Sequence, residues 1–102
     1  TSDEYFRIIK ANIDSGYPVM IHIGGFSSNA YFNYSLSGGH FILVIGAYTN
    51  SAGVKHIVCA DPHYKSVSTG SAQSYAFLDI PFDSYYDSYR WSGVAIRNVL
   101  WG

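Results

Sequence analysis

The part of the sequence that most constrains the fold is a pair of apolar segments in the middle of the chain. The first, His40–Tyr48 (HFILVIGAY), is almost entirely apolar, which is typical of a strand that is buried on both faces. Thr49–Gly53 (TNSAG) has the composition of a turn. Val54–Ala60 (VKHIVCA) is a second strand, and it ends at Asp61-Pro62 because proline cannot donate to a sheet ladder. The spacing predicts a β-hairpin.

This hairpin brings His40, which opens the first strand, and Asp61, which closes the second, to the same end. Two registers are open. If Tyr48 pairs with Gly53, His40 lies directly opposite Asp61, with Cβ atoms about 5 Å apart. If Tyr48 pairs with Val54, Phe41 lies opposite Asp61 instead. A histidine beside a carboxylate is the pair of side chains that serves as a general base and its orienting partner. Both registers therefore predict half of a nucleophilic catalytic site.

The N-terminal segment, Thr1–Ser15, predicts an amphipathic helix. Thr1 and Glu4 fit a capping box at its start. Gly16 is a natural residue to end it, and Pro18 prevents its continuation. The apolar positions recur at helical spacing: Phe6, Ile9 and Ile13.

The rest of the chain is rich in predicted strands. One helix followed by an antiparallel, strand-rich remainder predicts an α+β fold. No repeat or linker interrupts the sequence, which predicts a single unit over residues 1–102. The further elements expected are a strand at Pro18–Ile23, a loop at Gly24–Gly39, a polar loop at His63–Gln73 with an extended piece at Ser66–Thr69, a strand at Tyr75–Ile80, a short helix at Pro81–Tyr89 that has Pro81 as its first residue, and a closing strand at Gly93–Trp101.

Composition limits the classes of function. Apolar residues make up 48% of the chain and the net charge is −1 without a basic run, which argues for a real core and against nucleic acid as a partner. No apolar run reaches the length that spans a membrane. A single cysteine excludes internal disulfides, and ten tyrosines against six Lys and Arg are typical of secreted proteins and of peptide or carbohydrate binders. The chain begins without Met, which we interpret as a processed chain or a fragment.

The segments GGHFILVIGAY and IVCADP resemble the C-terminal half of the papain-like cysteine peptidases, closest to the bacterial branch that includes the double-glycine leader peptidases. In that family a Gly-His pair opens a long apolar strand, and a later strand ends in Asp-Pro. Gly39-His40 and Asp61-Pro62 match these two features. The resemblance implies the β-rich half of a papain-like fold.

The resemblance also implies an activity. His40 would be the general base and Asp61 the residue that orients it. Beside this base, we expect Gly39 and the loop aromatics Tyr31 and Phe32 to contact a peptide or protein substrate. The nucleophilic Cys of the family lies earlier in the chain, after a Gln, and these 102 residues contain no such segment. An upstream segment or a partner chain that carries the Cys would complete the site. The expected protein is a bacterial, secreted or cell-surface peptidase that needs no cofactor.

The segment before His40 leaves a second function open. It carries four aromatic residues, which either line a substrate cleft or hold a long loop against the body of the protein. The rival function is a non-catalytic module that binds a peptide or glycan through this aromatic loop, residues 26–34. The aromatic residues are Phe26, Tyr31, Phe32 and Tyr34.

Three further interpretations compete with the His40 and Asp61 site. Cys59 is a candidate nucleophile, but a small thiol on an apolar strand is typical of a core. His40, Asp61 and His63 have the residue types of a metal site, although no further ligand supports them. His22 is interpreted as a half-buried strand histidine. No Gly-x-Ser-x-Gly segment marks a serine nucleophile.

Overall fold

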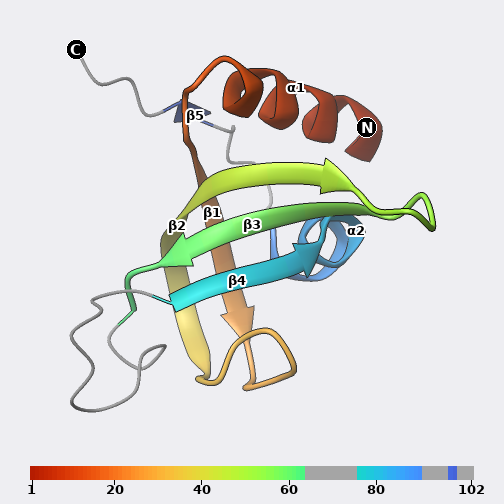
Figure 1. Ribbon diagram of the computed structural model, residues 1–102. Helices are drawn as coiled ribbons and strands as arrows, with labels where there is room; N and C mark the ends of the chain where they lie inside the picture. Colours follow the sequence, from red (N-terminus) through yellow and green to blue (C-terminus); the bar gives the residue numbers. More distant parts are fainter. Residues whose placement is uncertain (64–75, 91–96, 99–102) are drawn as a thin grey trace.

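The computed structural model describes residues 1–63, 76–90 and 97–98, and these residues form one antiparallel sheet with two helical segments (Figure 1). The strand order is β4-β3-β2-β1-β5. A helix followed by an antiparallel sheet confirms the predicted α+β class. The elements are α1 (Ser2–Asp14), β1 (Val19–Phe26), β2 (Leu36–Thr49), β3 (Lys55–Asp61), β4 (Ala76–Pro81), α2 (Phe82–Ser84), which continues as the π-helical turn η1 (Tyr85–Tyr89), and β5 (Arg97–Asn98).

Helix α1 begins and ends where the sequence predicts. The side chain of Thr1 accepts a hydrogen bond from the backbone N–H of Glu4, which caps the first turn. At the other end, the backbone N–H of Gly16 donates to Ile13 and that of Tyr17 donates to Asn12. This pair of bonds is a Schellman motif, and it requires the left-handed φ of +88° that Gly16 adopts.

Replacing Gly16 with alanine is therefore expected to lower the free energy of unfolding by about 1–2 kcal/mol, because an L-residue pays that much for a left-handed backbone. No heavy atom lies within 4 Å of the position that a Cβ would occupy at Gly16, so the effect comes from the backbone alone. Gly38→Ala is the matched control, since Gly38 has equally open surroundings and no positive φ. Urea unfolding measures both variants, and an equal loss in both would contradict the capping role.

The core lies on one face of the sheet, where both helices pack. Alternate strand residues point to this face, as the predicted period of two requires, and Val19, Ile21 and Ile23 of β1 are all buried. Phe6 of α1 and Phe82 of α2 meet over the sheet with ring centroids 5.3 Å apart. The other buried residues of this core are Ile9, Phe32, Tyr34, Ile42, Val44, Ile57, Cys59, Ile80 and Tyr85.

The opposite face of the sheet is not covered by the described residues, so the expectation that His40–Tyr48 is buried on both faces is wrong. Phe41 and Ile45 keep 47% and 40% of their surface exposed, because no described helix packs on that side. Phe77 of β4 is 56% exposed on the same face. An apolar groove of ≈ 450 Å³ crosses this face, lined by Leu43, Ile45, Ala60, Pro62 and Phe77.

Two predicted boundaries also change. The predicted loop Gly24–Gly39 shrinks to residues 27–35, because β1 runs on to Phe26 and β2 already begins at Leu36. The pairing continues through an irregularity between Gly24 and Phe26, where Gly25 supplies a φ of +55°.

At the other end of the sheet, Pro81 is the N-cap of α2 and not its first residue. The predicted extended piece at Ser66–Thr69 lies outside the described residues. So does most of the predicted strand Gly93–Trp101, of which β5 is the described part.

Candidate functional site

The hairpin of β2 and β3 forms in neither of the two registers considered. Leu43 pairs with Ala60, while Tyr48 pairs with His56, and the register shifts by one residue between Val44 and Gly46. The turn has the five residues expected but lies one position further along the chain, at residues 50–54, where the Asn50 side chain organises it. The Asn50 Oδ1 atom accepts the backbone N–H groups of residues 52 and 54, at 3.0 and 2.9 Å.

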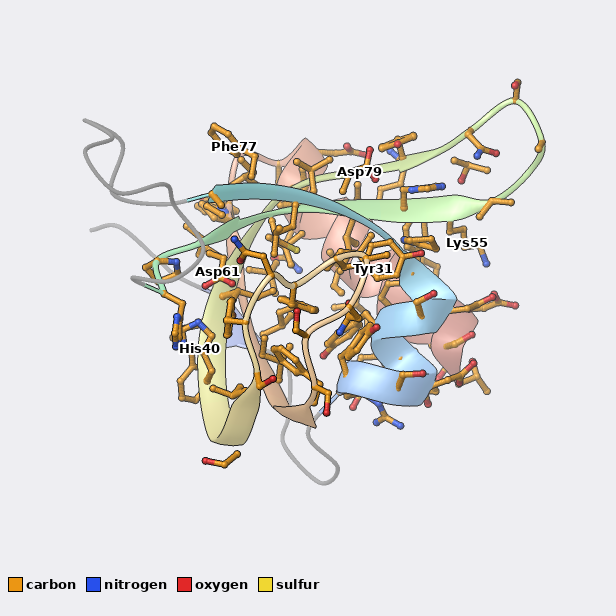
Figure 2. The ribbon with its side chains drawn as sticks, turned by 90° about the horizontal axis from the view of Figure 1, so that it is seen from below. Tyr31, His40, Lys55, Asp61, Phe77 and Asp79 are labelled. Carbon is orange, nitrogen blue, oxygen red and sulfur yellow. The ribbon has the colours of Figure 1, made fainter. Side chains whose placement is uncertain are left out.

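This register still brings His40 and Asp61 together. Both residues point to the core face, at the end of the hairpin away from its turn, where Figure 2 shows their side chains next to each other. The distance from Nε2 of His40 to Oδ1 of Asp61 is 2.8 Å. The contact is diagonal, which the spacing of side chains on one face of an antiparallel pair allows.

Asp61 is fully buried, with 0% of its surface exposed, and it is surrounded by donors. The Tyr34 hydroxyl donates to Oδ2 at 2.5 Å, and the backbone N–H of His63 donates to Oδ1 at 2.9 Å. A buried carboxylate is stable only when hydrogen bonds replace its hydration. An ionised carboxylate can only accept hydrogen bonds, so opposite it the Nε2 atom of His40 is the third donor.

The contact with Asp61 engages one ring nitrogen of His40. In the tautomer that donates from Nε2 to Asp61, the Nδ1 atom carries the lone pair. Within the described part of the chain, no residue forms a hydrogen bond with this nitrogen. The His40 side chain is 18% exposed, so it lies at the boundary between the core and the surface. Such a nitrogen can accept a proton from a group that approaches from outside the described chain.

Tyr34 is a member of the candidate site that the sequence reasoning did not assign to it. Its side chain is 3% exposed, and its ring stacks on that of His63 with centroids 3.9 Å apart and planes within 5°. Burial, together with the hydrogen bond to Asp61, raises the pKa of Tyr34 above its ordinary value, so the hydroxyl stays protonated and remains a donor. The one signal in the sequence was the position of Tyr34 among the aromatic residues that precede His40.

The residues expected to contact a substrate lie in different environments. Phe32 is 1% exposed and packs against Phe26 and Tyr89, with ring centroids 4.4 and 5.2 Å away. It therefore has no surface to offer a ligand, which favours the interpretation that the loop is held against the body. Tyr31 is half-buried beside Tyr89, and Gly39 is exposed in β2.

Cys59 and the metal hypothesis find no support. Cys59 is fully buried in the core, and burial raises the pKa of its thiol, the opposite of what a nucleophile needs. Among the described residues, no group of three His, Cys, Asp or Glu side chains could hold a metal ion. His63 meets Asp61 through its backbone N–H. His22 is partly buried on β1 and stacks on Phe41 at 4.3 Å.

A second Tyr–Asp–His cluster lies on the other face of the sheet and provides a comparison. The Tyr48 hydroxyl donates to Oδ2 of Asp79 at 2.5 Å, and Nδ1 of His56 lies 2.8 Å from Oδ1 of the same carboxylate. Here Asp79 is 50% exposed, and the Nδ2 atom of Asn50 lies 3.4 Å from the remaining ring nitrogen of His56. Both nitrogens of His56 are thus engaged, so this cluster links β2, β3 and β4 and is not placed to act as a base.

This second cluster predicts a pH effect on stability. The hydrogen bond from Tyr48, and a smaller one from His56, lower the pKa of Asp79 below its ordinary value near 3.8. A carboxylate with a lowered pKa stabilises the fold above its unfolded pKa, and this stabilisation is lost as the pH falls through the folded value. The stability difference between wild type and Asp79→Asn should therefore shrink below about pH 4. Urea unfolding at about pH 5 and pH 3 measures it, and a constant difference would contradict the prediction.

In the parts of the chain that the structure describes, neither helix has the length and apolar character needed to cross a membrane. The comparisons with known proteins find no family model, no curated protein and no solved structure that matches this chain. What the protein does must therefore follow from the chemistry of its own residues.

Proposed function

We propose that this chain supplies the histidine base and the aspartate orienter of a papain-like cysteine peptidase site, which a cysteine on another segment or on a partner chain completes. The observation that carries the proposal is the 2.8 Å contact between His40 Nε2 and a fully buried Asp61, with His40 Nδ1 left without a hydrogen bond to the described residues. The substrate would be a peptide or protein.

The chemistry follows from this geometry. His40 Nδ1 takes the proton from the approaching thiol, and the resulting thiolate attacks the carbonyl carbon of the scissile peptide bond. The imidazolium then gives its proton to the leaving amine, and water hydrolyses the acyl-enzyme with His40 again as the base. Asp61 holds the ring in one tautomer and stabilises the imidazolium that forms twice in this cycle.

The need for another segment follows from the chain's own cysteine. Cys59 lies in the core with a raised thiol pKa, and no other cysteine occurs in the 102 residues. The His40 side chain is 18% exposed at the boundary between the core and the surface, which supports access of a thiol from another segment to its ring.

The test is thiol labelling of the complete polypeptide that contains this chain, or of this chain mixed with the Cys-bearing segment. Iodoacetamide should label one cysteine outside these 102 residues at about pH 6, because pairing with His40 keeps it as a thiolate. In the His40→Ala variant, the labelling rate of that cysteine should fall by about tenfold or more. Mass spectrometry of the labelled peptides measures the rate.

His56→Ala is the matched control, since it removes the histidine of the second cluster and leaves His40 in place. It should keep the wild-type labelling rate. Labelling that is unchanged in His40→Ala would contradict the proposal, as would an equal decrease in both variants.

The rival function as a binding module is weakened by the burial of the aromatic loop. Phe32 and Tyr34 are 1% and 3% exposed, and the other two aromatic side chains of the loop, Phe26 and Tyr31, are half-buried. Two half-buried rings are a small contact area for holding a glycan or a peptide.

A further inference from the structure

We propose that Tyr34 is a positioning residue of this site: its buried hydroxyl holds Oδ2 of Asp61, so that Oδ1 faces His40 and keeps the ring in the tautomer that has Nε2 protonated and Nδ1 bare. The catalytic meaning of this inference rests on the proposed function. Its structural content, the control of the tautomer of His40, does not.

The loop that carries Tyr34 is held firmly in place. Oδ1 of Asn29 accepts the backbone N–H groups of Tyr31 and Phe32, at 2.9 and 3.2 Å, and the Asn29 N–H donates to the Phe32 carbonyl at 2.8 Å. Phe32 then anchors the loop in the core against Phe26. The aromatic residues of the loop therefore place the Tyr34 hydroxyl, and this is a use for them that requires no ligand.

Tyr34 constrains Asp61 from two sides. Its hydroxyl donates directly to Oδ2, and its ring stacks flat on His63, whose backbone N–H donates to Oδ1. The carboxylate cannot rotate without breaking one of these bonds. His40 meets the plane of the Tyr34 ring nearly edge-on, at 85° with centroids 6.4 Å apart, so all four side chains form one packed unit.

The hydroxyl also determines which atom carries the proton between His40 and Asp61. A buried carboxylate that loses a donor is less stable as an anion. Without the bond from Tyr34, the proton on Nε2 can move to Asp61, which then donates to Nε2. Nδ1 takes up a proton from the solvent, so the His40–Asp61 pair then holds one proton more than in the wild type. That tautomer has no lone pair on the nitrogen that faces away from Asp61, and it cannot accept a proton from a thiol there.

The test is the Tyr34→Phe variant, which keeps the ring and its stacking and removes the hydroxyl. Long-range ¹H–¹⁵N correlation spectra of the imidazole rings report the tautomer of His40 in this chain alone. In the wild type the Nδ1 atom of His40 should be bare and its Nε2 atom protonated. In Tyr34→Phe the ratio of the two tautomers should fall by about tenfold or more, as the loss of a charge-assisted hydrogen bond predicts.

Tyr48→Phe is the matched control, because it removes the same hydroxyl from the second Tyr–Asp–His cluster. It should leave the spectrum of His40 unchanged. An unchanged tautomer ratio in Tyr34→Phe overturns the proposal. If Tyr34→Phe does not fold, the wild type alone decides, since a His40 ring that is protonated on Nδ1 and bare on Nε2 overturns it as well.

Activity separates this inference from the proposed function. In the complete site, Tyr34→Phe should lower kcat about tenfold and leave KM unchanged, because the hydroxyl acts on the base and not on the substrate. A changed tautomer together with no labelled cysteine in the wild type supports the role of Tyr34 and counts against the peptidase. An unchanged tautomer with normal labelling does the reverse.

Discussion

Replacing Asp61 with alanine is expected to lower the free energy of unfolding by about 3–5 kcal/mol. The side chain is fully buried and accepts from the Tyr34 hydroxyl, the His63 backbone N–H and the His40 ring. Its removal leaves these donors without their acceptor in a region that water does not reach freely. Each unsatisfied buried donor costs about 1–3 kcal/mol, and the loss of packed volume adds to that.

Equilibrium unfolding in urea near neutral pH measures this loss. Asp79→Ala is the matched control, since Asp79 accepts equivalent bonds from Tyr48 and His56 but is half exposed. Water can take over those bonds, so its loss should stay below about 1 kcal/mol. If the two variants lose the same stability, burial is not what makes Asp61 important.

Replacing Phe32 with alanine is expected to cost about 3–5 kcal/mol as well. The ring is 1% exposed and lies in an aromatic cluster with Phe26, Tyr34 and Tyr89. Its removal leaves a cavity that this cluster cannot close without moving the backbone of the loop. Because the same loop carries Tyr34, the variant should also loosen the contact with Asp61.

Thermal and urea unfolding measure this prediction, with Tyr31→Ala as the control. Tyr31 is half-buried beside Tyr89, so its truncation should cost about 1 kcal/mol or less. A Phe32→Ala protein with wild-type stability would contradict the core position of Phe32 and would return that residue to the surface role considered for it.

Local sequence patterns predicted most of the elements correctly. Thr1 and Gly16 mark the ends of α1, because capping and a left-handed glycine are local requirements of the backbone. Val19, Ile21 and Ile23 identify the buried face of β1 through the period of two. The end of the hairpin at which His40 and Asp61 meet also followed, since any register of two strands of this length brings their outer ends together.

The arrangement on the two faces of the sheet could not be predicted in the same way. The apolar run of β2 looks the same whether one or both of its faces are covered. The described helices pack on one side, and Phe41 and Ile45 remain exposed on the other. What covers a face is decided by the packing of distant segments, which the composition of the strand does not contain.

The candidate site, too, has a part that the sequence predicted and a part that it did not. The sequence by itself determined that a histidine and an aspartate end two paired strands, because strand signals and turn residues are local. Only the tertiary structure decided the diagonal contact between His40 and Asp61, through the turn around Asn50 and the register shift after Val44. It also decided that Tyr34 completes the carboxylate's hydrogen bonds, since that contact joins residues 27 positions apart through the packing of a loop. Such contacts depend on how the whole chain between the two residues folds, and no single segment of the sequence determines that.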